Sequence, residues 1–136
     1  MVREICKDIF FLHRKAEPAT MADLPVAQDL QDTLKAHREG CVGMAANMIG
    51  VNKAIIIVNM GIFDMVMMNP VIVKKSGAYQ TEEGCLSLVG QRPCTRYEKI
   101  TVEYQDMAFR KVKMDFEGWT AEIIQHEVDH LQGIII

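Results

Sequence analysis

A short motif near the C-terminal end constrains this chain more than any other stretch: it reads His126-Glu127-Val128-Asp129-His130. In a helix, His126 and His130 lie on one face, one turn apart. Two imidazoles in this arrangement can bind one divalent metal ion, and Glu127 beside them can carry a proton. A hydrolytic site of this type uses three protein ligands and a water molecule. Because six residues follow the motif in this sequence, we expect the third ligand upstream.

The composition is that of one globular domain covering residues 1–136, with 49% apolar and 24% charged residues. A net charge of −3 argues against direct binding to nucleic acid. The longest apolar run, Ala54–Val58, is too short to cross a membrane. The first residues lack the apolar segment of a signal peptide, so we expect a cytoplasmic protein that is not attached to a membrane.

Two segments have the periodicity of amphipathic helices. Val26, Leu30 and Leu34 recur every four residues, which predicts a helix over residues 23–38. Residues 119–131 are predicted to form a second helix, in which apolar side chains flank the two histidines. The metal motif therefore belongs to the last helix of the chain.

The stretches between these helices are typical of strands. Strands are predicted at residues 54–58, 65–73, 100–104 and 111–116, the last two as a hairpin. Asn69-Pro70 predicts a bulge or an edge position within the second strand. Gly77 is predicted to open a loop that leads to Cys85. Two helices among several short strands indicate an α+β fold.

Residues 40–50 combine three glycines and two alanines within eleven residues. Small side chains leave the backbone accessible, which suits a segment that a ligand or another element approaches closely. A tightly packed bend and a binding segment both fit this composition. The Gly-Lys-Ser/Thr ending of a phosphate-binding loop is absent from the sequence.

Cys85 is the upstream ligand that we favour, because a thiolate binds zinc or ferrous iron well. It follows Gly84 in a polar segment rather than standing within an apolar strand. Cys6, Cys41 and Cys94 compete for this role. Each has a weak claim, because a buried free cysteine commonly serves as a small apolar residue. We expect thiols or metal ligands rather than disulfides in a chain without a secretion signal.

Three segments of the sequence share a pattern with one known family. They are Cys41-Val42-Gly43-Met44-Ala45-Ala46-Asn47-Met48, Glu83-Gly84-Cys85-Leu86-Ser87, and His126-Glu127-Val128-Asp129-His130 followed by Leu131-x-Gly133. Their order and spacing resemble those of the peptide deformylases. The motifs of that family read Gly-x-Gly-x-Ala-Ala-x-Gln, Glu-Gly-Cys-Leu-Ser and His-Glu-x-Asp-His.

The resemblance implies a fold and an activity. The implied fold is α+β, with antiparallel or mixed sheets packed around a central C-terminal helix that carries the metal motif, and with a further N-terminal helix. Such enzymes remove the formyl group from the N-terminal formyl-methionine of nascent polypeptides and release formate. They use one divalent metal ion, ferrous iron in cells, which zinc, nickel or cobalt can replace. The implied partners are formyl-methionyl nascent peptides and the ribosome, which a C-terminal extension helps many relatives to contact.

The resemblance also implies roles for the polar residues of the metal helix. Cys85, His126 and His130 are expected to hold the metal, by their positions in the family motifs. Glu127 is expected to be the general acid and base of the reaction. Asp129 points elsewhere on the helix, so we expect it to orient a neighbour rather than to bind the metal.

Further roles concern the substrate. The backbone amide of Leu86 is expected to donate to the oxyanion of the tetrahedral intermediate. The backbone around Val42, Gly43 and Gly84 is expected to hydrogen-bond the substrate as an added strand. The side chain of the substrate methionine is expected to enter an apolar pocket.

Two positions depart from the family pattern. Met48 stands where the family has a glutamine that supports the oxyanion, and a methionine side chain cannot donate a hydrogen bond. Asn47 is adjacent, but neighbouring side chains point in different directions, so we do not expect it to replace the glutamine. Cys41 replaces the first glycine and adds a side chain close to the substrate-binding edge. We expect the metal site to survive both changes and turnover to be reduced.

Two other functions are compatible with these residues. The first is a deformylase-like protein that binds metal and formyl-peptide with little or no turnover, because Met48 lacks the donor. The second is a closed structural zinc site. Its ligands would be Cys85, Cys94, His126 and His130. The presence of Glu127 argues against the structural site, which needs no base.

Overall fold

Strand β2 (Ile55–Asn59) lies at the centre of the fold and is buried on both faces. The computed structural model describes residues 1–135, apart from the side chain of Leu88. Side chains of a strand alternate between its two faces, so Ile55 and Ile57 enter one hydrophobic cluster and Ile56 and Val58 enter a second. All four residues are fully buried. The predicted strand at residues 54–58 is thus confirmed.

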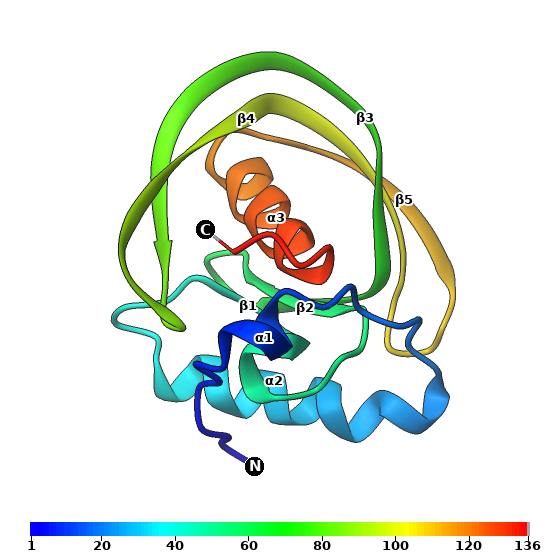
Figure 1. Ribbon diagram of the computed structural model, residues 1–136. Coiled ribbons are helices and arrows are strands. Elements are labelled where there is room, and N and C mark those ends of the chain that lie inside the picture. The colour runs from blue at the N-terminus through cyan, green and yellow to red at the C-terminus, as the bar shows by residue number, and fades with distance from the viewer. Residues whose placement is uncertain (136) are drawn as a thin grey trace.

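A single antiparallel sheet runs through the molecule in the order β1-β2-β3-β4-β5. Besides β2, its strands are β1 (Gly43–Ala45), β3 (Asp64–Cys85), β4 (Leu88–Gln105) and β5 (Lys111–Glu117). The three long strands arch over one helix, whereas β1 and β2 lie on the opposite side of that helix (Figure 1). The sheet therefore wraps around the helix instead of stacking on it as a flat layer.

The enclosed helix is α3 (Gly118–Leu131), which carries the metal motif. The other helices are α1 (Ile9–Leu12) and α2 (Leu24–Ala36), with the 3₁₀ turns η1 (Met21–Asp23) and η2 (Ala46–Ile49). Helix α2 packs against β1 and β2 from the side opposite to α3. Within residues 1–135, no helix is long and apolar enough to cross a membrane. This arrangement confirms the α+β fold with a central C-terminal helix.

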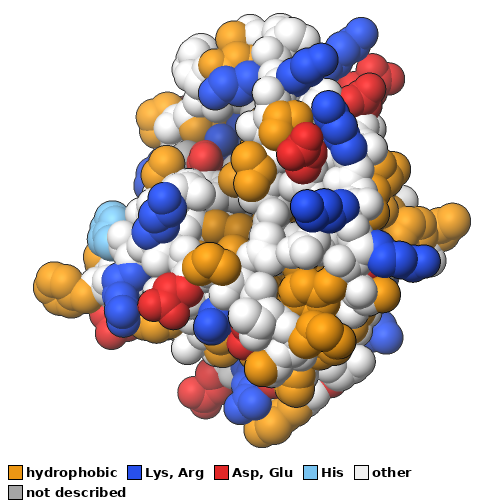
Figure 2. Space-filling model, turned by 90° about the vertical axis from the view of Figure 1, so that its right-hand side faces the viewer, with side chains coloured by type: hydrophobic (Ala, Val, Ile, Leu, Met, Phe, Trp, Pro, Cys, Tyr) orange, Lys and Arg blue, Asp and Glu red, His pale blue; other side chains and the backbone are white. Residues whose placement is uncertain are grey.

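The outer surface of the long strands is a mixture of charges and apolar side chains (Figure 2). On β5, Lys111, Lys113 and Asp115 are exposed. Lys113 lies 3.9 Å from Glu103 of the neighbouring strand, and the hydroxyl of Thr101 donates to Asp115. Charged and polar side chains of both strands meet here, as expected for the solvent-facing side of an antiparallel sheet.

Two of the strand predictions are confirmed in detail. The hairpin predicted at residues 100–104 and 111–116 forms, with Ile100 opposite Phe116. Near Asn69-Pro70 the ladder between β3 and β4 shifts register, and Asn69 has a positive φ of 52°. This irregularity is the predicted bulge, and it lies in an inner strand rather than at an edge.

The prediction that a loop starts at Gly77 was wrong. Strand β3 continues to Cys85, with Ser76 opposite Lys99 and Ala78 opposite Tyr97. Gly77 sits between these pairs with a φ of +75°, so it bends the strand without ending it. Most side chains between residues 73 and 84 are exposed or half-buried. Their polar composition hid the strand, because backbone pairing with β4 does not require an apolar face.

The two-residue turn Leu86-Ser87 joins β3 to β4 and positions the candidate site. Cys85 is the last residue of β3 and pairs with the first residue of β4. In Figure 1 the tip of this hairpin returns toward β1 and the helix that carries the histidines. The second family-like motif is thus a hairpin turn, close to the first and third motifs.

The end of α3 is anchored by the N-terminal segment of the chain. The amide of Ala16 donates to the carbonyl of Leu131 at 2.8 Å, and Nδ1 of His13 lies 3.2 Å from the carbonyl oxygen of Gly133. Gly133 has a φ of +80°, and a Cβ built on it would overlap the carbonyl group of His13. Only glycine fits both the backbone angle and this contact.

Replacing Gly133 by alanine is therefore expected to lower the free energy of unfolding. The loss should exceed the cost of about 1–2 kcal/mol that a positive φ alone imposes on a residue with a Cβ. Gly50→Ala is the matched control, because Gly50 has a φ of +81° and open space where its Cβ would lie. Urea unfolding of both variants measures the difference. Equal losses in the two variants would show that the contact with His13 does not constrain the chain.

Candidate active site

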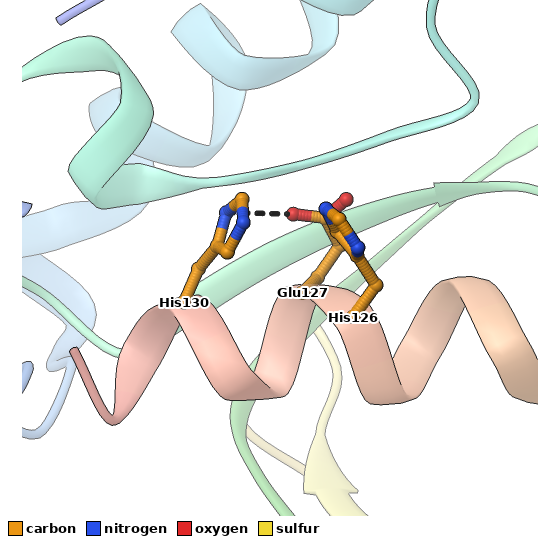
Figure 3. Close-up of side chains that lie close together, drawn as sticks. All are labelled: His126, Glu127 and His130. Atoms are coloured by element: carbon orange, nitrogen blue, oxygen red, sulfur yellow. Dashed lines mark ion pairs between the residues drawn. The ribbon is translucent and has the colours of Figure 1, made fainter. Parts of the chain in front are cut away.

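Helix α3 places three polar side chains together inside the molecule (Figure 3). His126, Glu127 and His130 are 8%, 4% and 2% exposed. One potential ligand atom from each lies within 4.8 Å of the others, and the two imidazole centroids are 4.6 Å apart. Nδ1 of His130 lies 3.4 Å from Oε1 of Glu127. The spacing read from the sequence thus produces a compact cluster of two imidazoles and a carboxylate.

His126 is oriented by a carboxylate from the hairpin. Its Nδ1 lies 2.8 Å from Oε1 of Glu83, two residues before Cys85. A carboxylate in this position accepts a hydrogen bond from Nδ1–H and leaves Nε2 as the nitrogen that can bind a metal. Glu83 thus links the hairpin motif to the helix motif.

Glu83 in turn belongs to a buried ion cluster around Arg96, which is 3% exposed. Nη2 of Arg96 lies 2.7 Å from Oε1 of Glu83, and its Nε donates to both carboxylate oxygens at 3.1 Å. Its Nη1 lies 2.6 Å from Oδ2 of Asp129. Burial alone would raise the pKa of Glu83, but hydrogen bonds from His126 and Arg96 hold it well below its usual range. The prediction that Asp129 orients a neighbour is confirmed.

Gln125 fixes the position of α3 relative to β4. Its side-chain amide donates to the carbonyl of Tyr97 at 2.8 Å, and its oxygen accepts from the amide of Tyr97 at 2.9 Å. A side chain paired with both backbone groups of one residue acts like an additional strand residue. Gln125, Arg96 and Glu83 were not identified as site residues from the sequence. The one available signal was that Glu83 begins the motif Glu83-Gly84-Cys85-Leu86-Ser87, whereas Arg96 lies outside every predicted element.

Glu127 is the most deeply enclosed acid of the site. Burial raises its pKa to about 7, although the nearby imidazole of His126 acts in the opposite direction. A Cβ built on Gly43 would lie 3.0 Å from Oε2 of Glu127 and 2.8 Å from Cγ2 of Ile123. The glycine therefore lets strand β1 approach the helix closely. Gly43 is thus tightly packed, and it also lines a cavity, while a binding role of the glycine-rich segment stays a prediction.

That cavity has a volume of about 560 Å³ and lies between the hairpin, β1 and α3. It is lined by most of the residues that the sequence pointed to, and these are Val42, Gly43, Met48, Gly84, Cys85, Leu86, His126 and Glu127. His130 is outside this lining but belongs to the cluster with His126 and Glu127. A peptide entering the cavity would therefore reach the carboxylate and one imidazole directly.

The four cysteines differ in their relation to the site. Cys85 and Cys41 line the cavity. Among the described residues, the compact cluster of potential ligands consists of His126, Glu127 and His130, without a thiol. Cys94 lies in β4 opposite Thr81 and outside the cavity lining. The described residues therefore give no support for a closed zinc site that includes Cys94.

The turn η2 directs Asn47 and Met48 to different places. Met48 lines the cavity although it is 1% exposed. Nδ2 of Asn47 donates to the backbone carbonyl of His130 at 2.8 Å. Asn47 thus anchors the last turn of α3, and its amide is not available in place of the missing glutamine. This position of Asn47 agrees with the expectation from the sequence that Asn47 does not replace the glutamine.

Comparison with known proteins identifies the family. A family model described as polypeptide deformylase matches residues 3–136. The chain belongs to the peptide deformylase family. It is 55% identical to a peptide deformylase of Clostridium beijerinckii over 136 residues, which is the full length of both chains. It is 36% identical to peptide deformylase 3 of Shewanella oneidensis over 129 residues, which cover 90% of this chain and 78% of that protein.

Solved deformylase structures share the fold. A peptide deformylase from Legionella pneumophila superimposes with a TM-score of 0.90 at 32% identity, covering 99% of this chain and 83% of that one. A class I type b peptide deformylase from Acinetobacter baumannii, with Met-Ala-Ser bound, gives a TM-score of 0.87 at 32% identity. This match covers 99% of this chain and 97% of that chain.

Membership makes this chain a formyl-amide hydrolase that processes protein N-termini. Deformylases are metal-dependent and act on formyl-methionyl peptides. The strong similarity to a curated deformylase does not favour the alternative of a protein that binds without turnover.

The residues present fit a divalent metal ion. Two buried imidazoles converge, and the hydrogen bond between His126 and Glu83 leaves Nε2 of His126 for a ligand. The thiol of Cys85 lines the same cavity as His126. A thiol and two imidazoles are donor types suited to zinc or ferrous iron.

The Arg96 cluster is expected to stabilise the fold around this site. Arg96→Met leaves Glu83 and Asp129 without their buried partner, and breaking a buried pair in this way costs about 3–5 kcal/mol. The free energy of unfolding measured in urea should fall by that amount. Arg110→Met is the matched control, because the ion pair of Arg110 with Asp106 is exposed and such pairs contribute little to stability. A loss at Arg96 no larger than that at Arg110 would contradict the structural role of the cluster.

Proposed function

We propose that this chain removes the formyl group from N-terminal formyl-methionine of nascent polypeptides and releases formate, with Glu127 as general acid and base. The observation that carries the proposal is the position of Glu127: it is buried, lines the peptide-sized cavity and lies beside His126 and His130. Membership of the deformylase family supports the choice of substrate.

Cys85, His126 and His130 are the proposed ligands of one divalent ion, iron(II) in cells, with zinc, nickel or cobalt as substitutes. A bound divalent cation supplies Lewis acidity, which lowers the pKa of water and polarises the formyl carbonyl. Glu83 accepts from His126 and so holds the ring in the tautomer and orientation needed for ligation. Asn47 holds the last turn of α3, from which His130 projects.

Glu127 is proposed to move the proton during hydrolysis. Its carboxylate accepts a proton from the attacking water and passes it to the nitrogen of the departing amine. Gly43 has no side chain, so the backbone of β1 comes close to this carboxylate and a peptide along that edge would lie within its reach. Burial excludes bulk water from the proton transfer.

The developing oxyanion needs hydrogen-bond donors near the formyl carbon. The amide of Leu86 is the proposed donor, because Leu86 lines the cavity in the turn directly after Cys85. Met48 lines the cavity as well and offers no donor. The site thus has the metal and base positions of the family, with one oxyanion donor fewer.

The peptide is proposed to bind between β1 and the hairpin, along Val42, Gly43 and Gly84. The bound Met-Ala-Ser in the Acinetobacter baumannii relative supports a peptide that begins with methionine. The apolar part of the cavity lining would receive the methionine side chain, and it consists of Val42, Met48, Leu86, Trp119 and Ile123. Nascent chains as substrates place the reaction in the cytoplasm, close to the ribosome.

Glu127→Gln is expected to reduce kcat by about 10²–10⁴-fold, because general acid–base catalysis contributes this much. The assay is formate release from formyl-Met-Ala-Ser by protein prepared anaerobically with iron(II) or nickel(II), with metal content measured for each variant. Glu117→Gln, an exposed residue just before the same helix, serves as the control and should keep full activity. Undiminished turnover of a metal-loaded Glu127→Gln variant would rule out the proposed mechanism.

Met48→Gln is expected to raise kcat/KM at least about tenfold, because one oxyanion donor is worth about 10²–10³ in turnover when it is well placed. Met48→Leu, which keeps an apolar side chain and adds no donor, should leave kcat/KM close to that of the unsubstituted protein. Steady-state kinetics with the same formyl-tripeptide distinguish the two. An unchanged kcat/KM in Met48→Gln would mean that another group already supplies the donor.

A further inference from the structure

The open edge of the sheet beside the candidate site offers specific backbone groups. Strand β1 is the first strand of the sheet, and among residues 1–135 it pairs on one side only, with β2. The amide of Asn59 donates to the carbonyl of Val42 at 2.8 Å, and Gly43 is directly opposite Val58. In an antiparallel pair, consecutive residues direct their backbone groups to opposite sides. The backbone N–H and C=O of Gly43 therefore face the open edge.

This geometry makes Gly43 the residue of β1 that can pair with an added peptide strand near Glu127. Val42 already uses its carbonyl within the sheet. A Cβ on Gly43 would lie 3.0 Å from Oε2 of Glu127, so the carbonyl of Gly43 belongs to the part of the edge next to the proposed base. A peptide bound there needs an acceptor for its own backbone N–H.

The carbonyl of Gly43 is already engaged. Sγ of Cys41 lies 2.9 Å from it and donates its S–H to the oxygen. Burial, together with the nearby charge of Glu127, raises the pKa of Cys41 to about 11, so the thiol keeps the proton that it donates. A thiol is a weak donor, which a backbone amide can displace. Cys41 is half-buried and lines the same cavity as the candidate catalytic residues.

We infer that Cys41 sets the affinity for the peptide substrate, because its thiol competes with the incoming backbone for the carbonyl of Gly43. The inference rests on the proposed function, since it concerns the peptide of that same site. The free protein contains the bond between Cys41 and Gly43, and the bound peptide replaces it. The loss of this bond weakens the ground-state complex and the transition state equally. It therefore raises KM and leaves kcat unchanged.

The test compares Cys41→Ala with Cys41→Ser. Alanine removes the competing donor and should lower KM for formyl-Met-Ala-Ser about two- to tenfold, since a single hydrogen bond contributes about 0.5–1.5 kcal/mol. Serine keeps a donor at nearly the same place, so KM should stay at or above that of the unsubstituted protein. In both variants kcat should change less than about twofold. Cys6→Ala, which removes a half-buried thiol outside the cavity lining, should leave KM unchanged.

A binding measurement makes the test independent of turnover. The single tryptophan, Trp119, lines the cavity and is 62% exposed, so its fluorescence can report binding of the peptide Met-Ala-Ser to nickel-loaded protein. Kd for this peptide should fall in Cys41→Ala and not in Cys41→Ser.

The possible results separate this inference from the proposed function. If Cys41→Ala and Cys41→Ser give the same Kd and KM as the unsubstituted protein, competition by the thiol is refuted. If the unsubstituted protein binds Met-Ala-Ser and releases no formate, the proposed reaction fails while Kd still decides the role of Cys41. If metal-loaded protein neither binds Met-Ala-Ser nor releases formate from formyl-Met-Ala-Ser, both the proposed reaction and the role of Cys41 are refuted.

Discussion

The buried guanidinium of Arg96 is the constraint on which the geometry of the site depends. Three elements meet at this one charge: Arg96 belongs to β4, Glu83 to β3 and Asp129 to α3. A buried charge is very unfavourable unless it is paired and hydrogen-bonded, so these elements cannot shift relative to one another without breaking that pairing. Because Glu83 also accepts from His126, the cluster orients the imidazole as well.

A second constraint is the close approach of β1 to α3 at Gly43. The absence of a side chain there lets the strand edge lie next to Glu127, and a larger residue would collide with Ile123. One glycine thus serves both packing and access to the proposed base. Two residues earlier, Cys41 covers the carbonyl that the open edge presents. The inferred competition thus places control of peptide affinity at a residue that is not among the proposed metal ligands.

The sequence predicted correctly those elements whose own residues show a periodic pattern, and it missed features that depend on distant segments. The helix at residues 119–131, the buried strand around Ile56 and the hairpin ending at Phe116 each show their own periodicity, and all three form. The polar half of β3 has no such pattern, because its partner is another strand rather than the core. Arg96 was missed for a related reason: its partners lie 13 and 33 residues away in the sequence, and an arginine in a strand usually faces solvent.

The sequence by itself determined the family and the residue types of the candidate site: a helix with His126 and His130 one turn apart, Glu127 between them in the sequence, and an upstream motif with Cys85. These features follow from residue type and short spacing, which helical geometry converts directly into proximity. Only the tertiary structure decided that Glu127 is buried against Gly43 and that Arg96 joins the hairpin to the helix. It also decided that Asn47 supports His130. The physical reason is that contacts between distant segments depend on how the whole sheet wraps around α3, which no local pattern encodes.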